Sequence, residues 1–578
     1  MLPEQGHNHD SSKSHSLPIK VVICWHMHQP YYKNRLTGEF AQPWTYLHAI
    51  KDYIDMATIL EMVPTAQAVI NFCPILLDQI DEYALQVNAF LNDKTPITDP
   101  LLSSLTLHLA PKSEKQRTKW IKQCLRANEN RLIKRFKPYD RLVKIAKEAL
   151  HSKELLKYLN DQFYFDLLVW YHLAWLGETV RMSDPEAQAL VKQKKNYQYN
   201  DRMQLIQLIG KLLTNVIPKY KKLQRSGQIE LSMTPFSHPI MPLMQDMQAG
   251  CDAEELPLPQ STYPIGDERV TWQLETGKES FQNHFGIKPT GCWPSEGGVS
   301  EKTLIAVEKA GFKWIATGES VLQNSLKRQV SNTPKCIHRA YQVKDIKLSC
   351  FFRDDNLSDS IGFTYTNWHG DDAVNNIIHH LENIREACID DCNKVVSIVL
   401  DGENCWEYYP NNGYHFLTAL YQKLSTHKLI ELTTFADFVV KNRDNVRLDN
   451  LVAGSWVYGT FSTWIGHEDK NHGWDLLNEA KHCFDQVISE GKLTESQLEQ
   501  AQIQMAICEG SDWFWWFGDY NANESVSDFD QLYRTHLKNL YLVLGLTPPA
   551  ELDKAISVGA GTSSSENAGT MRRGQKSS

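Results

Sequence analysis

The sequence lacks the patterns that would place it in several common classes of protein. It contains no run of about 18 apolar residues, so no membrane-spanning helix is expected. The N-terminal residues have no apolar core of the kind a signal peptide needs. Among the twelve cysteines there is no Cys-x-x-Cys pair, and Cys388 and Cys392 are the nearest neighbours. We therefore expect free thiols in a cytoplasmic protein, without a zinc knuckle or a disulfide framework.

An excess of positive charge is also missing. The 578 residues carry a formal net charge of -9 and offer no basic stripe that would neutralise phosphates. A nucleic-acid partner is therefore not expected. The chain is instead rich in aromatic residues, with 16 Trp and 23 Tyr. Many of them stand beside Gly, Asn and Asp in loop-like segments, which suggests flat surfaces that stack on sugars or bases.

Short apolar runs followed by polar residues recur along the chain. Such runs indicate buried parallel strands, and they occupy residues 19–25, 66–72, 227–233, 312–316, 347–352 and 395–400. Segments with helical periodicity lie between these runs. We count about seven units of a strand and a helix, which predicts a parallel α/β barrel. Residues from about 99 to 217 have helical spacing throughout and are interpreted as an insertion, with Trp170 and Trp175 in its core.

The run at residues 395–400 ends in Asp401-Gly402-Glu403-Asn404. An α/β barrel presents its chemistry just past the C-terminal ends of its strands, so two carboxyl groups at this place predict a catalytic site. The period of a strand lets Asp401 and Glu403 point to the same side. The other interpretation, an aspartate that caps the next helix, is less favoured.

His26-Met27-His28 follows the first strand and is the sequence feature that most resembles a metal site. The spacing puts both imidazoles on one face, as in metal-dependent hydrolases. The next polar residue is Gln29, a poor zinc ligand, and direct hydrogen bonding to a ligand is the alternative. We therefore treat a metal-dependent hydrolase that uses His26 and His28 as a minor hypothesis.

Further polar residues stand in loops after predicted strands. His238 precedes a proline and is interpreted either as a ligand contact or as part of a structural turn. Glu296 lies between Trp-Pro-Ser and Gly-Gly, which holds it in a tight turn rather than on a helix. Arg353 stands beside two acids, Asp354 and Asp355, and either forms a surface ion pair or orients a carboxylate at the strand end.

Five segments of the chain, in this order, resemble glycoside hydrolase family 57, the α-glucan-active branch that includes α-amylases and amylopullulanases. They read HMHQP, GQIELSMTPFSHPIMPL, GCWPSEGGVS, LDGENCWEYYPNNGY and GSWVYGTFSTWIG, and the later EGSDWFWWFGD also matches. The resemblance covers residues 19 to 546. It implies an incomplete (β/α)7 barrel followed by a helical bundle that completes the cleft.

The resemblance also implies roles for single residues. Glu296 matches the nucleophile of a retaining mechanism and Asp401 its general acid/base, with no cofactor and no obligatory metal. An α-glucan is the implied partner. The predicted substrate-binding set contains His28, Gln29, His238, Trp293, Asp354, Glu403, Trp406, Trp464, Asp512 and Trp515.

The predicted layout has a disordered tail over residues 1–17 and a barrel over 18–431 with its insertion around 99–217. A C-terminal helical domain over 432–548 and a disordered tail over 549–578 follow. Two alternatives to hydrolysis remain open at this stage. A 4-α-glucanotransferase would use the same two carboxyl groups, and a glucan-binding protein without turnover is disfavoured by the intact Glu296 and Asp401.

Overall fold

The computed structural model describes residues 17–330, 336–388, 393–442 and 444–559. The predicted N-terminal tail, including the histidines at positions 7, 9 and 15, lies outside the described residues apart from residue 17. The same holds for residues 560–578. Residues 549–559 are described, and here the buried Ile556 donates its backbone N–H to Asp530 Oδ1 at 2.7 Å. This part of the predicted tail therefore packs against the helical region.

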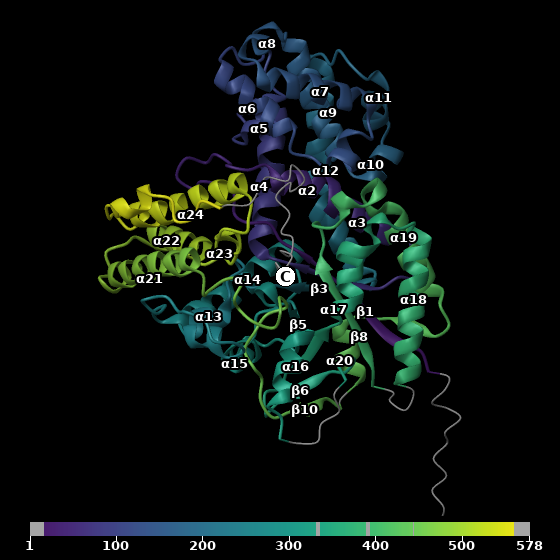
Figure 1. The fold of residues 1–578 in the computed structure, drawn as a ribbon, viewed down its shortest axis with the longest axis vertical. Helices are drawn as coiled ribbons and strands as arrows, with labels where there is room; N and C mark the ends of the chain where they lie inside the picture. Colours follow the sequence, from purple (N-terminus) through teal and green to yellow (C-terminus); the bar gives the residue numbers. More distant parts are fainter. Residues whose placement is uncertain (1–16, 331–335, 389–392, 443, 560–578) are drawn as a thin grey trace, which may run out of the picture.

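Seven parallel strands close into a barrel at the centre of the molecule (Figure 1). In order around the barrel they are β1 (Ile19–Met27), β2 (Ala68–Phe72), β3 (Ile229–Met233), β4 (Gly291–Cys292), β5 (Trp314–Gly318), β7 (Ser349–Arg353) and β8 (Val395–Asp401). β1 and β8 pair along seven residues, whereas β7 and β8 close the ring through the single pair Arg353 and Ser397. The predicted barrel of seven strands is confirmed.

Three shorter strands extend this sheet outside the ring. β6 (Tyr341–Val343) runs antiparallel to β7, β10 (Val446–Leu448) runs parallel to β6, and β9 (Ile430–Leu432) runs parallel to the start of β1. β10 lies beyond residue 431, where the sequence analysis placed the end of the barrel domain. The sheet thus extends past that boundary.

The alternation of side chains along each strand decides which residues reach the barrel interior. Val22 and Cys24 of β1 and Val395 and Val399 of β8 belong to the same interior cluster. Successive side chains of a strand point to opposite faces, so the interior face of each strand continues at every second residue. On β1 the next interior residue is His26, and on β8 it is Asp401. The two polar residues therefore stand at the C-terminal mouth of the barrel.

The opposite end of the barrel is closed by α20 (Phe435–Lys441), whose Phe435 and Phe438 join the interior cluster. Glu230 on β3 accepts a hydrogen bond from the backbone N–H of Ala436 at 2.9 Å, and another from Trp314 Nε1 at 2.7 Å. The buried carboxyl group therefore has partners, as burial in an apolar interior requires. The open end of the barrel is the one that holds His26 and Asp401.

Helices surround the barrel and connect its strands. They are α2 (Trp44–His48), α3 (Ile54–Met62), α4 (Pro74–Asp93), α13 (Met241–Gln245), α14 (Gly266–Phe285), α15 (Glu301–Lys309), α16 (Glu319–Lys327), α17 (Asp355–Asp359), α18 (Gly370–Ala387) and α19 (Tyr414–Thr426). Among the described residues, no helix combines the length and the apolar character that crossing a membrane requires.

The insertion between β2 and β3 forms the upper lobe in Figure 1. Its helices are α5 (Pro100–Ser104), α6 (Glu114–Cys124), α7 (Lys137–His151), α8 (Lys153–Tyr158), α9 (Asp161–Trp175), α10 (Glu178–Ser183), α11 (Pro185–Gln193) and α12 (Tyr199–Arg225). Trp170 and Trp175 are buried in α9, in agreement with the sequence interpretation.

The C-terminal region is helical as expected and lies on the left in Figure 1. It contains α21 (Glu468–Ser489), α22 (Glu495–Cys508), α23 (Asp512–Trp516) and α24 (Asn523–Val543). Pro239, in the loop after β3, forms an isolated bridge with Gly510. Ser511 donates its backbone N–H to His238 O at 2.9 Å. These contacts fix the start of α23 directly over the mouth of the barrel.

Candidate active site

Asp401 is the last residue of β8 and pairs in register with His26 of β1. Its side chain is half-buried at the barrel mouth, and Asn404 donates its amide to Asp401 Oδ2 at 2.6 Å. Burial raises the pKa of Asp401 to about 6, against the opposing effects of the Asn404 hydrogen bond and of the nearby His28 and Arg353. The carboxyl group therefore exchanges its proton close to neutral pH.

Glu296 lies in a strained turn that follows β4. Its backbone has φ 56°, in the left-handed region that an L-residue rarely adopts, and such strain persists only where the surroundings impose it. The side chain is buried and accepts a hydrogen bond from Trp456 Nε1 at 3.0 Å. Burial, followed by the charges of Asp401 and Asp512, raises the pKa of Glu296 to about 8.

Glu296 and Asp401 open into one cavity of about 740 Å³, part of which is open to solvent. The other lining residues are Arg353, Asp359, Gly362, Phe363, Leu400, Asn404, Cys405, Trp456, Val457 and Trp515. Carbon-rich aromatic walls with a few polar groups are typical of a ligand site of this size. Phe363, Trp456 and Trp515 provide aromatic surfaces in this cavity, and the two carboxyl groups provide acidic ones.

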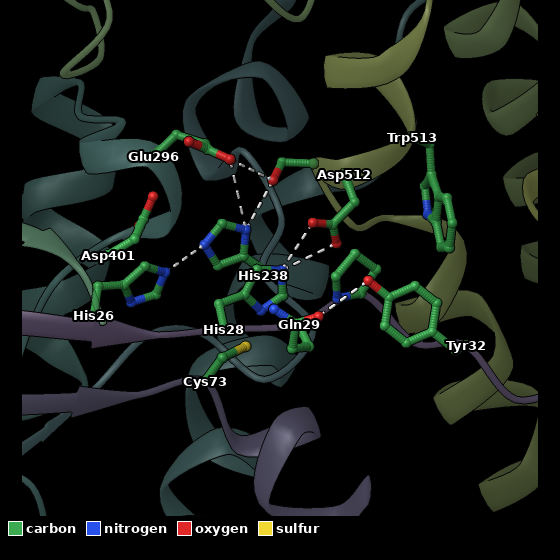
Figure 2. A network of polar contacts seen from close by, with 12 residues as sticks. His26, His28, Gln29, Tyr32, Cys73, His238, Glu296, Asp401, Asp512 and Trp513 are labelled. Atoms are coloured by element: carbon green, nitrogen blue, oxygen red, sulfur yellow. Dashed lines mark hydrogen bonds and ion pairs between the residues drawn. The ribbon is translucent and has the colours of Figure 1, made fainter. Parts of the chain in front are cut away.

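Three imidazoles lie behind the two carboxyl groups, and we call His26, His28 and His238 the histidine stack. The ring centroids of His28 and His238 are 3.8 Å apart at an interplanar angle of 10°, and those of His26 and His238 are 5.1 Å apart. Figure 2 shows Glu296 and Asp401 on the same side of this stack. The stack, Glu296, Asp401 and Glu403 line a second, smaller cavity that adjoins the first.

A chain of hydrogen bonds runs from the histidine stack to Glu296. Burial lowers the pKa of His26 to about 3 and that of His238 well below its usual value, so both rings are neutral. His26 Nδ1 is 2.7 Å from Asn71 Oδ1, and His26 Nε2 is 3.1 Å from His238 Nε2. His238 Nδ1 is 2.8 Å from Ser511 Oγ, which is 3.1 Å from Glu296 Oε1.

The two ends of this chain have defined donors. Asn71 uses its amide N–H on Ser232 Oγ, so its Oδ1 accepts from His26 Nδ1. At the other end, Ser511 donates its hydroxyl to Glu296 Oε1. This hydrogen bond lowers the pKa of Glu296, but burial and the charges of Asp401 and Asp512 outweigh it.

Two further acidic groups border the stack. His28 Nε2 contacts Asp512 Oδ1 at 2.9 Å, which joins β1 to α23. Glu403 accepts from Gln29 Nε2 at 3.3 Å and from the backbone N–H of His28 at 3.4 Å. Among the described residues, Glu403 Oε2 has no hydrogen-bond partner. Burial and the charge of Asp401 raise the pKa of Glu403 well above its usual value.

Part of the predicted substrate-binding set gathers here: His28, Gln29, His238 and Glu403 line the second cavity, Trp515 lines the first, and Asp512 contacts His28. The remaining four residues line neither cavity. The fully buried Trp293, Trp406 and Trp464 pack against Trp456, Trp25 and Trp515, respectively. Because these three rings are buried, none of them has a face that a ligand in either cavity could contact.

Asp354 also lies outside both cavities. Its Oδ1 accepts from the backbone N–H of Leu357 and so caps α17, and its Oδ2 is 2.9 Å from His338 Nε2. Of the two acids that the sequence analysis considered as ion-pair partners of Arg353, Asp355 forms the pair, and Asp359 forms a second one. A strand end places several neighbouring side chains on different faces, and the sequence does not show which of them reaches the cavity.

Sequence reasoning did not single out Trp456 or Ser511, although both stand in segments that it quoted. Each of them donates a hydrogen bond to one of the two oxygens of Glu296. Arg353 lines the main cavity and donates its Nε–H to Val399 O at 2.8 Å. The sequence did contain a signal for Trp456, because it stands in an aromatic loop that begins at Gly454 and ends at Gly466. Such a loop is a candidate for contact with a ligand.

The structure suggests a different set of ligands for the minor metal hypothesis than the sequence did. His28, His238 and Asp512 offer ligand atoms that all lie within 4.8 Å of one another. His26, one of the two histidines considered from the sequence, instead contacts Asn71 and His238. Two imidazoles and a carboxylate are a donor set that suits zinc.

Comparisons with known proteins agree with this architecture. The family model described as "Glycosyl hydrolase family 57" matches residues 22–449. A search among curated protein sequences found no match. Solved structures of similar fold include a family 57 branching enzyme from Thermococcus kodakaraensis, with a TM-score of 0.59 and 14% sequence identity, covering 91% of this chain and 90% of that chain.

Two other solved structures are similar over most of their length. A family 57-type branching enzyme from Pyrococcus horikoshii has a TM-score of 0.59 and 15% identity, with 92% of this chain and 93% of that chain covered. The α-amylase AmyC from Thermotoga maritima has a TM-score of 0.55 and 12% identity, with 92% and 93% covered. These likenesses show the fold. With the family model matching well over half of the sequence, the chain belongs to glycosyl hydrolase family 57.

Proposed function

We propose that the protein is a retaining glycoside hydrolase that cleaves α-glucosidic bonds in starch, glycogen or maltooligosaccharides, with Glu296 as nucleophile and Asp401 as general acid/base. The observation that carries this proposal is the pair of carboxyl groups, from two different strand ends, that opens into one aromatic cavity. Family membership and the names of the similar solved structures, two branching enzymes and an α-amylase, support the substrate class.

Double displacement needs one proton on the carboxyl pair. Asp401 gives that proton to the glycosidic oxygen while ionised Glu296 attacks the anomeric carbon and forms a glycosyl-enzyme ester. Asp401 then takes a proton from water, which attacks the same carbon and releases Glu296. Two inversions restore the original anomeric configuration.

The protonation of the site is consistent with this requirement. With pKa values of about 8 for Glu296 and about 6 for Asp401, the pair holds one proton between these pH values. Before a sugar binds, the higher pKa of Glu296 favours that proton on Glu296. Catalysis requires it on Asp401, and the positive charge that develops at the anomeric carbon favours the ionised form of Glu296. Trp456, which donates to Glu296 Oε2, stabilises the same form.

Hydrolysis and glucan transfer share these steps and differ in the acceptor. A 4-α-glucanotransferase would pass the glucosyl group from Glu296 to a sugar hydroxyl instead of water. We propose hydrolysis of the α-amylase or amylopullulanase type as the main activity. The similar branching enzymes make transfer the alternative that an experiment has to exclude.

The test is a product analysis on starch, pullulan and maltoheptaose, with Glu296→Gln as the inactive control. We expect shorter maltooligosaccharides and reducing ends that keep the α-configuration when first released. Products longer than maltoheptaose, without net formation of reducing ends, would assign the enzyme to transfer. Equal product formation by Glu296→Gln would reject the nucleophile assignment, and with it the proposed mechanism.

A further inference from the structure

A second cluster of reactive side chains lies on the outer side of the barrel. Cys336 and His338 precede β6, and Cys388 directly follows α18. Although the two segments are distant in sequence, one ligand atom from each of the three residues lies within 4.8 Å of the others. All three side chains are half-buried, so solvent reaches the cluster. The sequence analysis noted that Cys388 and Cys392 are the nearest pair of cysteines, but it did not predict that Cys388 lies beside Cys336 and His338.

Asp354 fixes the orientation of the imidazole in this cluster. Its Oδ2 is 2.9 Å from His338 Nε2, and its other oxygen is held by the backbone N–H of Leu357 at 2.9 Å. The Nδ1 atom of His338 is thereby left for the thiols. A carboxylate that holds the outer nitrogen of a histidine is the usual support of a metal-binding imidazole, because it sets the tautomer and the ring orientation.

We propose that Cys336, His338 and Cys388 bind one zinc ion, with Asp354 as the residue that orients His338. Two thiolates and one imidazole are soft and borderline ligands, which zinc prefers and which calcium and magnesium do not. Three protein ligands leave the fourth tetrahedral position for water or a further ligand. Binding releases the two thiol protons to solvent, and no electrons are transferred.

The place of the cluster in the fold indicates what the ion does. It lies where β7 and β8 close the barrel through a single residue pair. His338 O accepts from the backbone N–H of Val395 at 3.0 Å, and Asp354 donates its backbone N–H to Ser397 O at 2.8 Å. An ion held by segments before β6 and after α18 would cross-link the stretches that flank this seam. Its effect is therefore on stability, and it does not depend on the proposed hydrolysis.

The experiment measures zinc in the full chain, purified under reducing conditions, incubated with zinc and dialysed. We expect about one zinc ion per wild-type chain, and loss of that ion in Cys336→Ser and in Cys388→Ser. Cys483→Ser, which changes a half-buried cysteine in the helical region, is the matched control and should keep the ion. Replacement by cobalt should give the thiolate-to-metal absorption and the intense visible bands of tetrahedral coordination in wild type and control only.

A milder variant covers the case in which the cysteine variants fold poorly. Asp354→Asn keeps a residue that caps helices, yet it removes the carboxylate that faces His338. We expect its zinc affinity to fall by about 10–100-fold. Three results would overturn the proposal: wild-type protein that retains no zinc, a zinc content that is equal in all variants, or Cys336 and Cys388 joined in a disulfide whose reduction yields no metal binding.

Discussion

Two clusters in this molecule, one of three histidines and one of a histidine with two cysteines, show how the surroundings decide the chemistry of an imidazole. The histidine stack is fully enclosed at the barrel mouth, and its rings contact each other, Asn71, Ser511 and Asp512. His338 is half-buried on the outer side and faces two thiols and one carboxylate. The first arrangement is a hydrogen-bonded network that reaches Glu296 through Ser511. The second has the donors of the zinc site that we propose.

The difference teaches that burial alone does not assign a function. Burial lowers the pKa of His26 and His238, so these rings act as neutral links in a hydrogen-bond chain. In contrast, the Asp354 carboxylate and the two thiols raise the pKa of His338. The same groups would stabilise the positive charge of a bound metal ion. The predictions below separate catalysis at the first cluster from stability at the second.

The largest effect is expected for Glu296→Gln. Loss of the covalent nucleophile should lower kcat on maltoheptaose by at least about 10⁴-fold, because no glycosyl-enzyme forms. Steady-state rates measure this, and circular dichroism should show an unchanged fold. Glu495→Gln, on the exposed surface of α22, is the matched control and should keep wild-type rates. A folded Glu296→Gln enzyme of normal activity would remove the central role of this residue.

Asp401→Asn should reduce activity by about 10²–10⁴-fold on a natural glucan, which has a poor leaving group that needs protonation. An activated aryl glucoside, if accepted, needs little protonation in its first step. Its turnover should be limited by the second step, and azide, a nucleophile that needs no base, should restore it. The azido-glucoside product should keep the anomeric configuration of the substrate.

Equal losses on both substrates without azide rescue would shift the acid/base role away from Asp401. Glu403 would then be the next residue to test, because its raised pKa also favours a protonated carboxyl group at neutral pH.

The pH dependence follows from the two raised pKa values. Below about pH 6 both carboxyl groups hold protons, so the nucleophile is lost as pH falls. Above about pH 8 both are ionised, so the acid is lost as pH rises. We expect kcat/KM to peak between these values and to fall about tenfold per pH unit on either side. A rate that stays flat from pH 5 to 9 would contradict this assignment.

The smallest effect on catalysis is expected from metal removal. In Cys336→Ser, which lacks one ligand of the proposed zinc site, EDTA should leave kcat unchanged within about twofold, because no step of the double displacement uses a metal. In the wild type, EDTA should lower the midpoint of thermal unfolding, since an ion bound only to the folded state stabilises it. A complete loss of kcat in Cys336→Ser, restored by zinc, would instead favour metal chemistry at His28, His238 and Asp512.

Much of the fold could be predicted because its signals are local. The apolar run that ends at Asp401 indicates a buried strand by its own composition, without knowledge of the segments that pack around it. A parallel barrel then brings the C-terminal ends of such strands together. Glycines beside Glu296 indicated the tight turn that the structure shows at φ 56°. The order of the quoted segments gave the family and the two proposed catalytic residues.

The remaining features depend on contacts between distant segments. Trp293, Trp406 and Trp464 were expected in the substrate-binding set, yet each is fully buried against another tryptophan. Whether a tryptophan forms the wall of a cavity or supports that wall depends on packing, which a single sequence does not reveal. The approach of Cys336 to Cys388 likewise follows from the closure of the barrel and from no local pattern.

The most direct measurement traps the covalent intermediate. Asp401→Asn is mixed with α-glucosyl fluoride, an activated donor that needs no acid, and is quenched rapidly before peptide mapping by mass spectrometry. The account predicts one added glucosyl unit on the peptide that contains Glu296, and no adduct in the Asp401→Asn/Glu296→Gln double variant. A stable adduct on another residue, or turnover of the fluoride to a product of inverted configuration, would contradict the two-step mechanism on Glu296.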